Sequence, residues 1–299
     1  MSNNKIKKYV KSVIIIIFVT FLFYISLGRK DIKNPFAPTE LVYKTVDGKY
    51  LKLDVYFPKD TLTKHKTIIY FHGGSWISGT KLKVLERYRF YAVEQLLKQN
   101  IEIISVDYRL IRSNSHLNQC LEDCHDAVKF CLENADYMKV DTSRIGLWGS
   151  SAGAHLAMLV YGKRNSDNYC NFKNIKFLID DFGPTDIYTM WSISPDWFKK
   201  LIATDFYDIN TSEISVFDSL SREFSPNKYC NELRKIPILI SHGSNDKIVN
   251  FSQSESLHDS LAENSEYYLY VGQPHGFNTL DSAGIKLYAA RLLEFVADN

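Results

Sequence analysis

The stretch RIGLWGSSAGAHLAML, residues 144–159, decides the fold class of this chain. Its first five residues form an apolar run typical of a strand, and the apolar residues after Gly153 are typical of a helix. Between them lies the spacing Gly-x-Ser-x-Gly, residues 149–153. A strand that turns at once into a helix crowds its own backbone, so glycines on both sides let Ser151 stand exposed over the helix N-terminus. The pattern predicts a nucleophile elbow at Ser151, with a plain glycine-serine turn as the alternative.

Two polar residues that follow later strands are the expected partners of Ser151. Asp246 comes after the apolar run 236–241, and His275 comes after the run 266–271. In an open parallel sheet, ligands bind beyond the carboxyl ends of the strands, where these residues would meet. A serine hydroxyl needs a base to remove its proton, and the base needs an orienting carboxylate. The chain order therefore predicts Ser151 as nucleophile, Asp246 as acid and His275 as base.

Each of these assignments has an alternative. Asp246 fits a turn residue, His275 fits a loop histidine, and Asp180 or Asp181 is the fallback acid at the end of the apolar run 175–182. Three other histidines near the predicted site are expected to brace a loop or to point away from the chemistry: His72, His155 and His242. We therefore expect none of the three to act as the base.

The stretch HGGSW, residues 72–76, follows the apolar run 67–71. A tetrahedral oxyanion needs preorganised donors, and residues without side chains let backbone N–H groups approach it. We expect the donors to be the amides of Gly74, Ser75 and Ala152, with Gly73 as the alternative. The helix dipole at Ala152 acts in the same direction. A plain glycine turn is the other interpretation.

Apolar strands alternate with helices along most of the chain. Asp47-Gly48 lies between two runs of alternating polarity, which predicts a hairpin. The later expected strands are 67–71, 101–106, 144–148, 175–182, 236–241 and 266–271, and the expected helices are about 84–99, 117–135, 154–161, 251–263 and 283–297. This alternation predicts an α/β fold with a mostly parallel, doubly wound sheet and helices on both faces.

Residues 185–230 interrupt this alternation. They have no strand signal, but they are rich in large apolar side chains, namely Tyr188, Met190, Trp191, Trp197, Phe198, Phe206 and Phe217. Long insertions at strand ends often carry binding functions, so we expect a helical cap over the active site. Packing of these helices on the sheet is the alternative.

The first 30 residues differ from the rest of the chain. Residues 12–28 run for 17 positions without a charge after a lysine-rich start. This length is short for a membrane span but long for a signal peptide. We expect residues 1–30 to be an uncleaved membrane anchor, with a cleaved signal and secretion as the alternative. Because lysines precede the segment, we expect the domain to lie outside the cytoplasm. Residues 31–40 are an expected linker, and residues 41–299 the catalytic domain.

Charge and cysteine content limit the partners. The formal net charge is +2, but removing the six basic residues of segment 1–30 leaves 30 basic against 34 acidic residues, a net charge of −4. This balance does not favour nucleic-acid binding. No metal-ligand spacing accompanies the predicted site, so we expect no metal or other cofactor. Of the five cysteines, Cys120, Cys124 and Cys131 fall on one helix face and are expected to be buried thiols.

These motifs together resemble the α/β-hydrolase carboxylesterases of the hormone-sensitive-lipase-like and feruloyl-esterase-like groups. The resemblance rests on HGG-x-W at 72–76, DYR at 107–109, GSSAGAHL at 149–156, SP at 225–226, HG-x-x-D at 242–246 and His275. It covers roughly Tyr43 to Phe295. Many relatives have a third glycine where this chain has Ser75.

The resemblance implies hydrolysis of a small-molecule carboxylic ester, with a short-chain acyl, acetyl or feruloyl-type group, through a Ser-His-Asp acyl-enzyme mechanism. The HGG-x-W form also resembles kynurenine formamidases, and a peptidase of the same fold fits the same three residues. The identity of the ester, the preferred acyl length and the oligomeric state stay open.

Overall fold

A computed structural model describes residues 36–60, 62–112, 115–165, 172–192, 196–207 and 214–299. Within these residues no helix combines the length and apolar character that a membrane crossing needs. The segment 12–28, where we expect an anchor or signal, lies outside the described residues, as does the first half of the expected linker 31–40.

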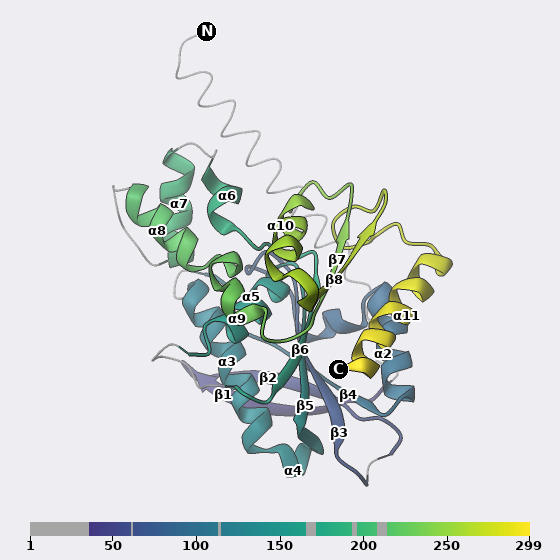
Figure 1. Cartoon of the computed structure of the whole chain (residues 1–299). Coiled ribbons are helices and arrows are strands. Elements are labelled where there is room, and N and C mark those ends of the chain that lie inside the picture. The colour runs from purple at the N-terminus through teal and green to yellow at the C-terminus, as the bar shows by residue number, and fades with distance from the viewer. Residues whose placement is uncertain (1–35, 61, 113–114, 166–171, 193–195, 208–213) are drawn as a thin grey trace. The chain divides into compact units, whose positions relative to one another are not determined.

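An eight-stranded sheet forms the centre of the domain (Figure 1). Its strands are β1 (Thr39–Val46), β2 (Lys49–Tyr56), β3 (His65–Phe71), β4 (Ile101–Val106), β5 (Val140–Ser150), β6 (Ile175–Asp181), β7 (Ile238–Gly243) and β8 (Ser265–Tyr270). The spatial order is β1-β2-β4-β3-β5-β6-β7-β8. The pairs β1–β2 and β2–β4 are antiparallel, and all pairs from β4 onward to β8 are parallel. The predicted mostly parallel sheet is confirmed.

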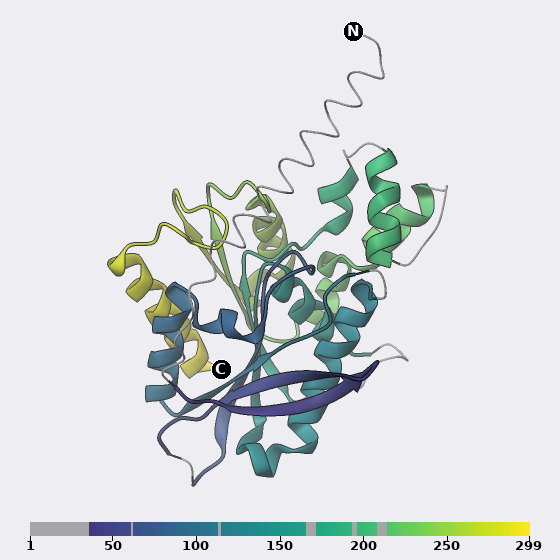
Figure 2. The same cartoon turned by 180° about the vertical axis from the view of Figure 1, so that it is seen from behind.

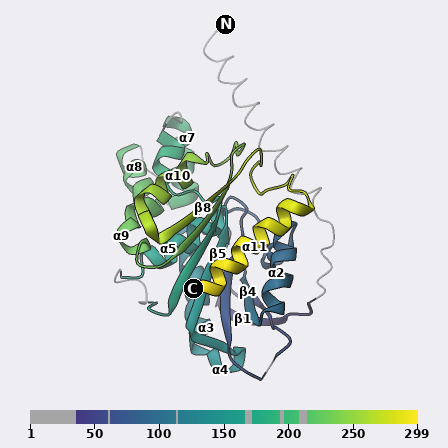
Figure 3. The same ribbon diagram turned by 45° about the vertical axis from the view of Figure 1, so that its right-hand side comes forward.

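Helices cover both faces of the sheet, as the alternation of elements predicts. The helices of the described residues are α2 (Tyr88–Lys98), α3 (Leu117–Glu133), α4 (Ala135–Met138), α5 (Ala152–Gly162), α6 (Ile187–Ser192), α7 (Asp196–Tyr207), α8 (Ile214–Glu223), α9 (Cys230–Leu233), α10 (Ser252–Leu261) and α11 (Ser282–Asp298), with short 3-10 helices η1 (Lys81–Leu85), η2 (Pro226–Tyr229) and η3 (Ala262–Asn264). Figure 3 shows α2 and α11 side by side on one face, with α3 and α5 on the other.

Burial explains the sequence patterns of the strands. Every residue of β4 is buried, and six of the seven residues of β3 are, because helices cover both faces of these strands. The hairpin of β1 and β2 lies at the edge of the sheet, along the front of the view in Figure 2. Its turn residues Asp47 and Gly48 have φ of 49° and 71°, the left-handed pair that a tight hairpin requires.

The element boundaries differ from the expected ones where the backbone turns left-handed. The helix expected from about 84 begins only at Tyr88, because Arg87 has a φ of 56° and separates it from η1. The strand expected to run through Phe182 ends at Asp181, because Phe182 has a φ of 47°. The three cysteines of α3, Cys120, Cys124 and Cys131, are free and buried, which confirms the prediction of buried thiols.

Candidate active site

The predicted elbow lies where β5 ends and α5 begins. Ser151 has a φ of 53° and a ψ of −121°, a strained conformation for a residue with a side chain. A Cβ on Gly149 would lie 2.3 Å from the amide nitrogen of Ala154, and one on Gly153 would lie 2.0 Å from the carbonyl oxygen of Phe71. Only glycine fits at either position, since such contacts are far shorter than atoms allow. The Ser151 amide donates to the carbonyl of Asp181 at 2.8 Å, which ties the turn to β6.

Asp246 follows β7 in a tight loop and is buried. Its Oδ1 accepts the amides of Ile248 at 2.8 Å and Val249 at 3.0 Å, which fix the direction of the carboxylate. Its Oδ2 faces two imidazoles, His242 at 3.2 Å and His275 at 2.6 Å. Burial alone would raise the pKa of Asp246, but hydrogen bonds from the two histidines bring it well below its usual range. Asp246 is therefore an ionised, acceptor-only group.

His275 follows β8 and joins the other two residues. Its Nδ1 lies 2.6 Å from Asp246 Oδ2, and its Nε2 lies 2.9 Å from Ser151 Oγ. Because an ionised carboxylate only accepts, the proton of the neutral ring is on Nδ1, and Nε2 presents a lone pair to the serine hydroxyl. The structure thus brings Ser151, His275 and Asp246 into one hydrogen-bonded chain. Sequence analysis predicted catalytic roles for all three.

The HGGSW loop passes directly over the elbow. A Cβ on Gly73 would lie 2.7 Å from the carbonyl oxygen of Ser150 and 3.2 Å from the Cβ of Ser151, so the loop is close to the nucleophile position. Gly74 has a φ of +136°, which residues with side chains rarely adopt. Among the described residues, the amides of Gly74, Ser75 and Ala152 donate to no other protein group. These N–H groups are therefore available to a ligand, as an oxyanion site requires, and so is that of Gly73, the alternative donor, which likewise has no protein acceptor among the described residues.

The remaining histidines near the site have bracing contacts. Burial lowers the pKa of His72 to about 3, and its ring stacks on Tyr108 at 4.2 Å between centroids. Burial also lowers the pKa of His155 to about 4. His242 contacts Ser254 Oγ at 2.7 Å through Nδ1 and Asp246 Oδ2 at 3.2 Å through Nε2. Its ring therefore helps to hold the Asp246 carboxylate in place. None of the three contacts Ser151 Oγ, which agrees with the sequence expectation.

A family model described as BD-FAE matches residues 53–261. The chain belongs to the BD-FAE family. Together with its relatives and structural neighbours, this places the chain among the α/β-hydrolase carboxylesterases of the hormone-sensitive-lipase-like and feruloyl-esterase-like group.

Curated relatives of this BD-FAE member are named as esterases. A probable isoprenylcysteine alpha-carbonyl methylesterase of Oryza sativa is 26% identical over 239 residues, 75% of this chain and 54% of its own length. The neutral cholesterol ester hydrolase 1 of Rattus norvegicus is 31% identical over 137 residues, 44% of this chain and 32% of its own. The chain spans about half the length of the first of these relatives, and less of the second.

Solved structures share the fold at low identity. The native form of a thermophilic esterase of Thermogutta terrifontis, Est2, has a TM-score of 0.69 at 20% identity, covering 90% of this chain and 95% of its own. Its propionate-bound form has a TM-score of 0.66 at 20% identity, covering 89% of this chain and 96% of its own. The α/β-hydrolase fold is therefore confirmed.

In this BD-FAE chain the fallback acids Asp180 and Asp181 lie beneath the elbow, and neither bonds to His275. Asp181 accepts the indole N–H of Trp148 at 2.9 Å and the hydroxyls of Tyr88 at 3.1 Å and Tyr288 at 2.9 Å. Burial raises the pKa of Asp181 to about 6 and that of Asp180 to about 8. The hydrogen bonds to Asp181 hold the end of β6 next to the end of β5, where Ser151 follows.

Sequence analysis missed one residue that touches the site. The ring of Phe182 packs edge-on against His275, with 4.9 Å between centroids and an interplanar angle of 66°. Its left-handed backbone is unusual for a bulky residue, and a hydrogen bond from its amide to the carbonyl of Ser241 at 2.8 Å helps to hold it. A phenylalanine at the end of an apolar run gives no signal of this geometry.

The described part of the expected cap, residues 185–230, contains α6, α7, α8 and the 3-10 helix η2, between β6 and β7. The helices α6, α7 and α8 form one group in Figures 1 and 2. Phe206 of α7 packs edge-on against Trp76 of the HGGSW loop, with 5.4 Å between centroids. This insertion therefore contacts the loop beside Ser151. Its role as a cap stays a prediction.

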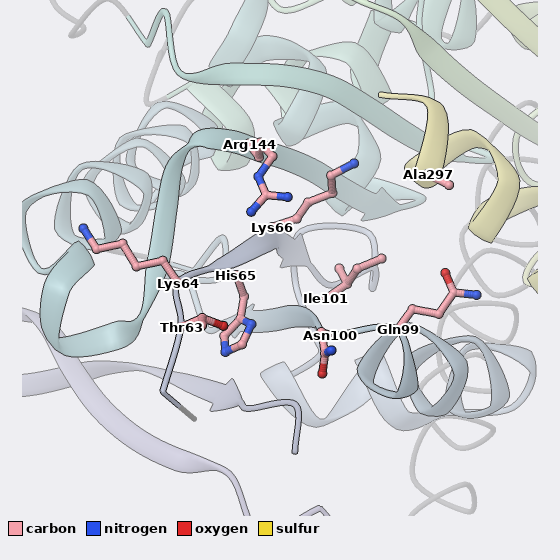
Figure 4. A pocket seen from close by; sticks show the side chains of 9 residues that line it. All are labelled: Thr63, Lys64, His65, Lys66, Gln99, Asn100, Ile101, Arg144 and Ala297. Atoms are coloured by element: carbon pink, nitrogen blue, oxygen red, sulfur yellow. The ribbon is translucent and has the colours of Figure 1, made fainter. Parts of the chain in front are cut away.

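A cavity of about 350 Å³ lies at the amino-terminal edge of β3 and β4 (Figure 4). None of its nine lining residues is a predicted site residue. Lys66, which lines it, donates through Nζ to the carbonyl of Val296 near the end of α11 at 2.6 Å. Within the described part of the chain, no group of three or more His, Cys, Asp or Glu side chains is arranged to hold a metal ion.

Proposed function

We propose that this chain is a serine hydrolase that cleaves carboxylic esters, of the short-chain acyl or acetyl/feruloyl type, through an acyl-enzyme. Ser151 is the nucleophile, His275 the general base and acid, and Asp246 the group that orients the base. The observation that carries the proposal is the continuous hydrogen-bonded chain, 2.9 Å from Ser151 Oγ to His275 and 2.6 Å from His275 to Asp246. In this arrangement the hydroxyl proton has an immediate acceptor.

The first half of the reaction forms the acyl-enzyme. Ser151 Oγ attacks the ester carbonyl carbon while its proton moves to His275 Nε2. The carbonyl oxygen becomes an oxyanion, and the amides of Gly74, Ser75 and Ala152 donate to it. When the carbon–alkoxy bond breaks, the imidazolium gives its proton to the departing alkoxide, which leaves as the alcohol. Asp246 stays ionised and stabilises the imidazolium that forms.

The second half regenerates the enzyme with water as the nucleophile. His275 Nε2 takes a proton from the water as the oxygen attacks the acyl carbon. The oxyanion forms again at the same amides, and the Ser151–acyl bond breaks. The proton then passes from His275 to Ser151 Oγ, and the carboxylic acid departs. No metal or redox group takes part in this proposed sequence.

The names of the relatives favour an ester over an amide as the substrate. They are called methylesterase and cholesterol ester hydrolase, and the solved structures include an esterase with propionate or butyrate bound. Short acyl groups are thus the first substrates to examine. Amide cleavage of the formamidase or peptidase kind remains the alternative.

Two assays test this proposal. Hydrolysis of p-nitrophenyl acetate and butyrate and of a feruloylated sugar is compared with that of N-formylkynurenine and an aminoacyl anilide. We expect turnover of the esters, whereas preferential cleavage of either amide would contradict the substrate class. A fluorophosphonate should label the parent and the Ser150→Ala variant but not Ser151→Ala. Labelling that survives in folded Ser151→Ala would move the nucleophile.

We further propose that residues 12–28 anchor the chain in the cell membrane as a single span with the domain outside the cytoplasm. Support comes from the uncharged run and the lysines that precede it. Protease added to intact cells should remove the domain, and full protection would contradict this orientation. Recovery of a soluble form that starts near Arg29 would indicate a cleaved signal and secretion.

A further inference from the structure

The HGGSW loop has an unusual run of backbone angles. Gly74, Ser75 and Trp76 have φ of 136°, 53° and 59°, so three successive residues are left-handed and only one is glycine. Each non-glycine residue in this region costs about 1–2 kcal/mol, and a bulky tryptophan there is a clear outlier. Contacts elsewhere must therefore stabilise this loop.

Backbone bonds explain only part of that stabilisation. The carbonyl of Gly74 accepts the amides of Ile77 at 3.1 Å and Ser78 at 3.0 Å, and the carbonyl of Trp76 accepts the amide of Ile111 at 2.9 Å. These bonds hold the carbonyls of the loop. The amides of Gly74 and Ser75, the proposed oxyanion donors, take no part in these bonds and have no protein acceptor in the described residues.

The side chain of Trp76 supplies the remaining anchor. It is only 4% exposed, and its indole Nε1–H donates to His155 Nδ1 at 3.3 Å. The same imidazole meets the indole edge-on, with 5.1 Å between centroids and an interplanar angle of 84°. Phe206 contacts the indole as well, as described above. The tryptophan that occupies the outlying backbone position is thus fixed through its ring.

His155 is itself held in one orientation. It is fully buried, and its Nε2 lies 2.7 Å from the carbonyl oxygen of Phe224, just after α8. A carbonyl only accepts and an indole N–H only donates, so Nε2 carries the proton and Nδ1 the lone pair. Because burial lowers the pKa of His155 to about 4, the ring stays neutral near neutral pH. The direction of donation runs from Trp76 to His155 to Phe224.

We propose that His155 is a positioning residue for the oxyanion site: it holds the Trp76 indole, and through it the left-handed loop whose Gly74 and Ser75 amides receive the oxyanion. The inference rests on the proposed function. His155 lies on α5, and its own amide donates to the carbonyl of Ser151 at 3.1 Å. One side chain therefore links the helix that supplies the Ala152 amide to the loop that supplies the other two donors.

The link to Phe224 extends this arrangement to the insertion. Ser225, the next residue, accepts the amide of Ile187 at the start of α6 and donates to the carbonyl of Ser221 in α8. Both ends of the helical insertion are thus tied to the same few residues that hold the oxyanion loop. A shift of α8 would move the acceptor on which the orientation of His155 depends.

The test separates positioning from general stability. Trp76→Phe removes the indole donor and keeps an aromatic ring, and His155→Leu removes the acceptor. We expect each to lower kcat by about 10- to 100-fold with little change in KM, because misplaced donors weaken mainly the transition state. The double variant should lose little more than either single variant, because the two residues act as a unit. His155→Asn, whose oxygen can accept from the indole, should recover part of the activity.

The decisive readout is a transition-state analogue. The Ki of a trifluoromethyl ketone, which forms a tetrahedral adduct at Ser151, should rise in parallel with the loss of kcat/KM, while inhibition by the product carboxylate stays constant. The matched control is His125→Leu, another buried histidine, on α3. It should lower Tm without changing the analogue's Ki.

The outcomes distinguish a failure of the positioning role of His155 from a failure of the proposed function. Folded Trp76→Phe and His155→Leu variants that keep parental kcat and analogue affinity overturn the positioning role but leave the triad intact. A parent that hydrolyses no ester and is not labelled at Ser151 overturns the proposed function and this inference with it. Where His155→Leu does not fold, Trp76→Phe and His155→Asn decide the question.

Discussion

The carboxyl ends of β6 and β7 each bury aspartate, and the two sites affect their carboxyl groups in opposite ways. At the end of β7, Asp246 has a pKa well below its usual range. At the end of β6, burial raises the pKa of Asp180 to about 8 and that of Asp181 to about 6. All three are at least 95% buried, so depth alone does not decide the charge state.

The groups that surround each carboxyl account for the opposite pKa shifts. Asp246 faces two imidazoles, and both can donate to it and compensate its charge. The Oδ1 of Asp180 accepts the Gly183 amide at 2.8 Å, while its Oδ2 is buried with no hydrogen-bond partner in the described structure. Asp181 accepts from neutral hydroxyls and one indole, and burial raises its pKa by more than these partners and the nearby guanidinium of Arg89 lower it. A residue that must stabilise an imidazolium has to be ionised, and the lowered pKa of Asp246 keeps it in that form near neutral pH, whereas the raised pKa of Asp180 favours its neutral form near pH 7.

The largest expected effect tests whether the β7 site performs the chemistry. Ser151→Ala should lower kcat by about 10³-fold or more, and adding His275→Ala should cost little further, because the residues act as a unit. Steady-state kinetics on p-nitrophenyl acetate measures both. Additive losses would mean that Ser151 and His275 act independently, which the hydrogen-bonded geometry does not allow.

The second prediction compares the two strand ends directly. Asp246→Asn should lower kcat by about 10³-fold or more, because an amide favours the wrong tautomer of His275. Asp181→Asn should leave kcat within about an order of magnitude of the parent. It should still lower stability by about 1–3 kcal/mol, because buried hydroxyl and indole donors lose an acceptor. Kinetics and thermal unfolding of both variants check this, and the reverse ranking in kcat would make β6 the source of the acid.

A smaller effect on kcat should come from the ring of Phe182, which follows β6 and packs on His275. Phe182→Leu should lower kcat by about 2- to 10-fold, the equivalent of an aromatic pair worth roughly 0.5–1.5 kcal/mol, because His275 loses the ring that packs on it. Phe177→Leu, on the amino-terminal part of β6, is the matched control. Its ring packs on Phe295 with 5.9 Å between centroids, away from His275, so its kcat should not change. Equal losses in both variants would indicate a general packing effect.

The smallest effect concerns Asp180 and is visible only in stability. Its pKa is raised to about 8, above the value of about 3.9 expected in the unfolded chain, so between these limits the folded state binds more protons. The free energy of unfolding therefore falls as the pH rises from 4 to 8. Asp180→Asn mimics the neutral acid and should gain stability relative to the parent between pH 5 and pH 8. A constant difference in Tm across that range would show that Asp180 does not titrate there.

The sequence predicted the sheet and the meeting of Ser151, Asp246 and His275 because both depend on order along the chain. Apolar runs determine parallel strands, and residues just after such strands lie at one edge of the sheet. The glycines of the elbow also have a local cause, since the backbone itself excludes a Cβ at Gly149 and Gly153. The catalytic roles stay predictions until the variants above are measured.

Other features depend on pairings that a single sequence does not display. The contact of Trp76 with His155 joins residues 79 positions apart, and the bond from Tyr288 to Asp181 joins residues 107 apart. The left-handed backbone of Phe182 likewise arises from its neighbours, because phenylalanine has no preference for it. The motifs predicted which groups react, but they gave no information on the side chains that hold those groups in place.

The reactivity of the three thiols of α3 would report how often this helix moves away from the sheet. Cys120, Cys124 and Cys131 are fully shielded from solvent, and burial raises the pKa of the Cys124 thiol well above its usual range. An alkylating reagent needs both access and a thiolate, so it reacts only when α3 separates from the sheet. The rate of alkylation under native conditions would therefore measure how often this helix separates from the sheet in the folded protein.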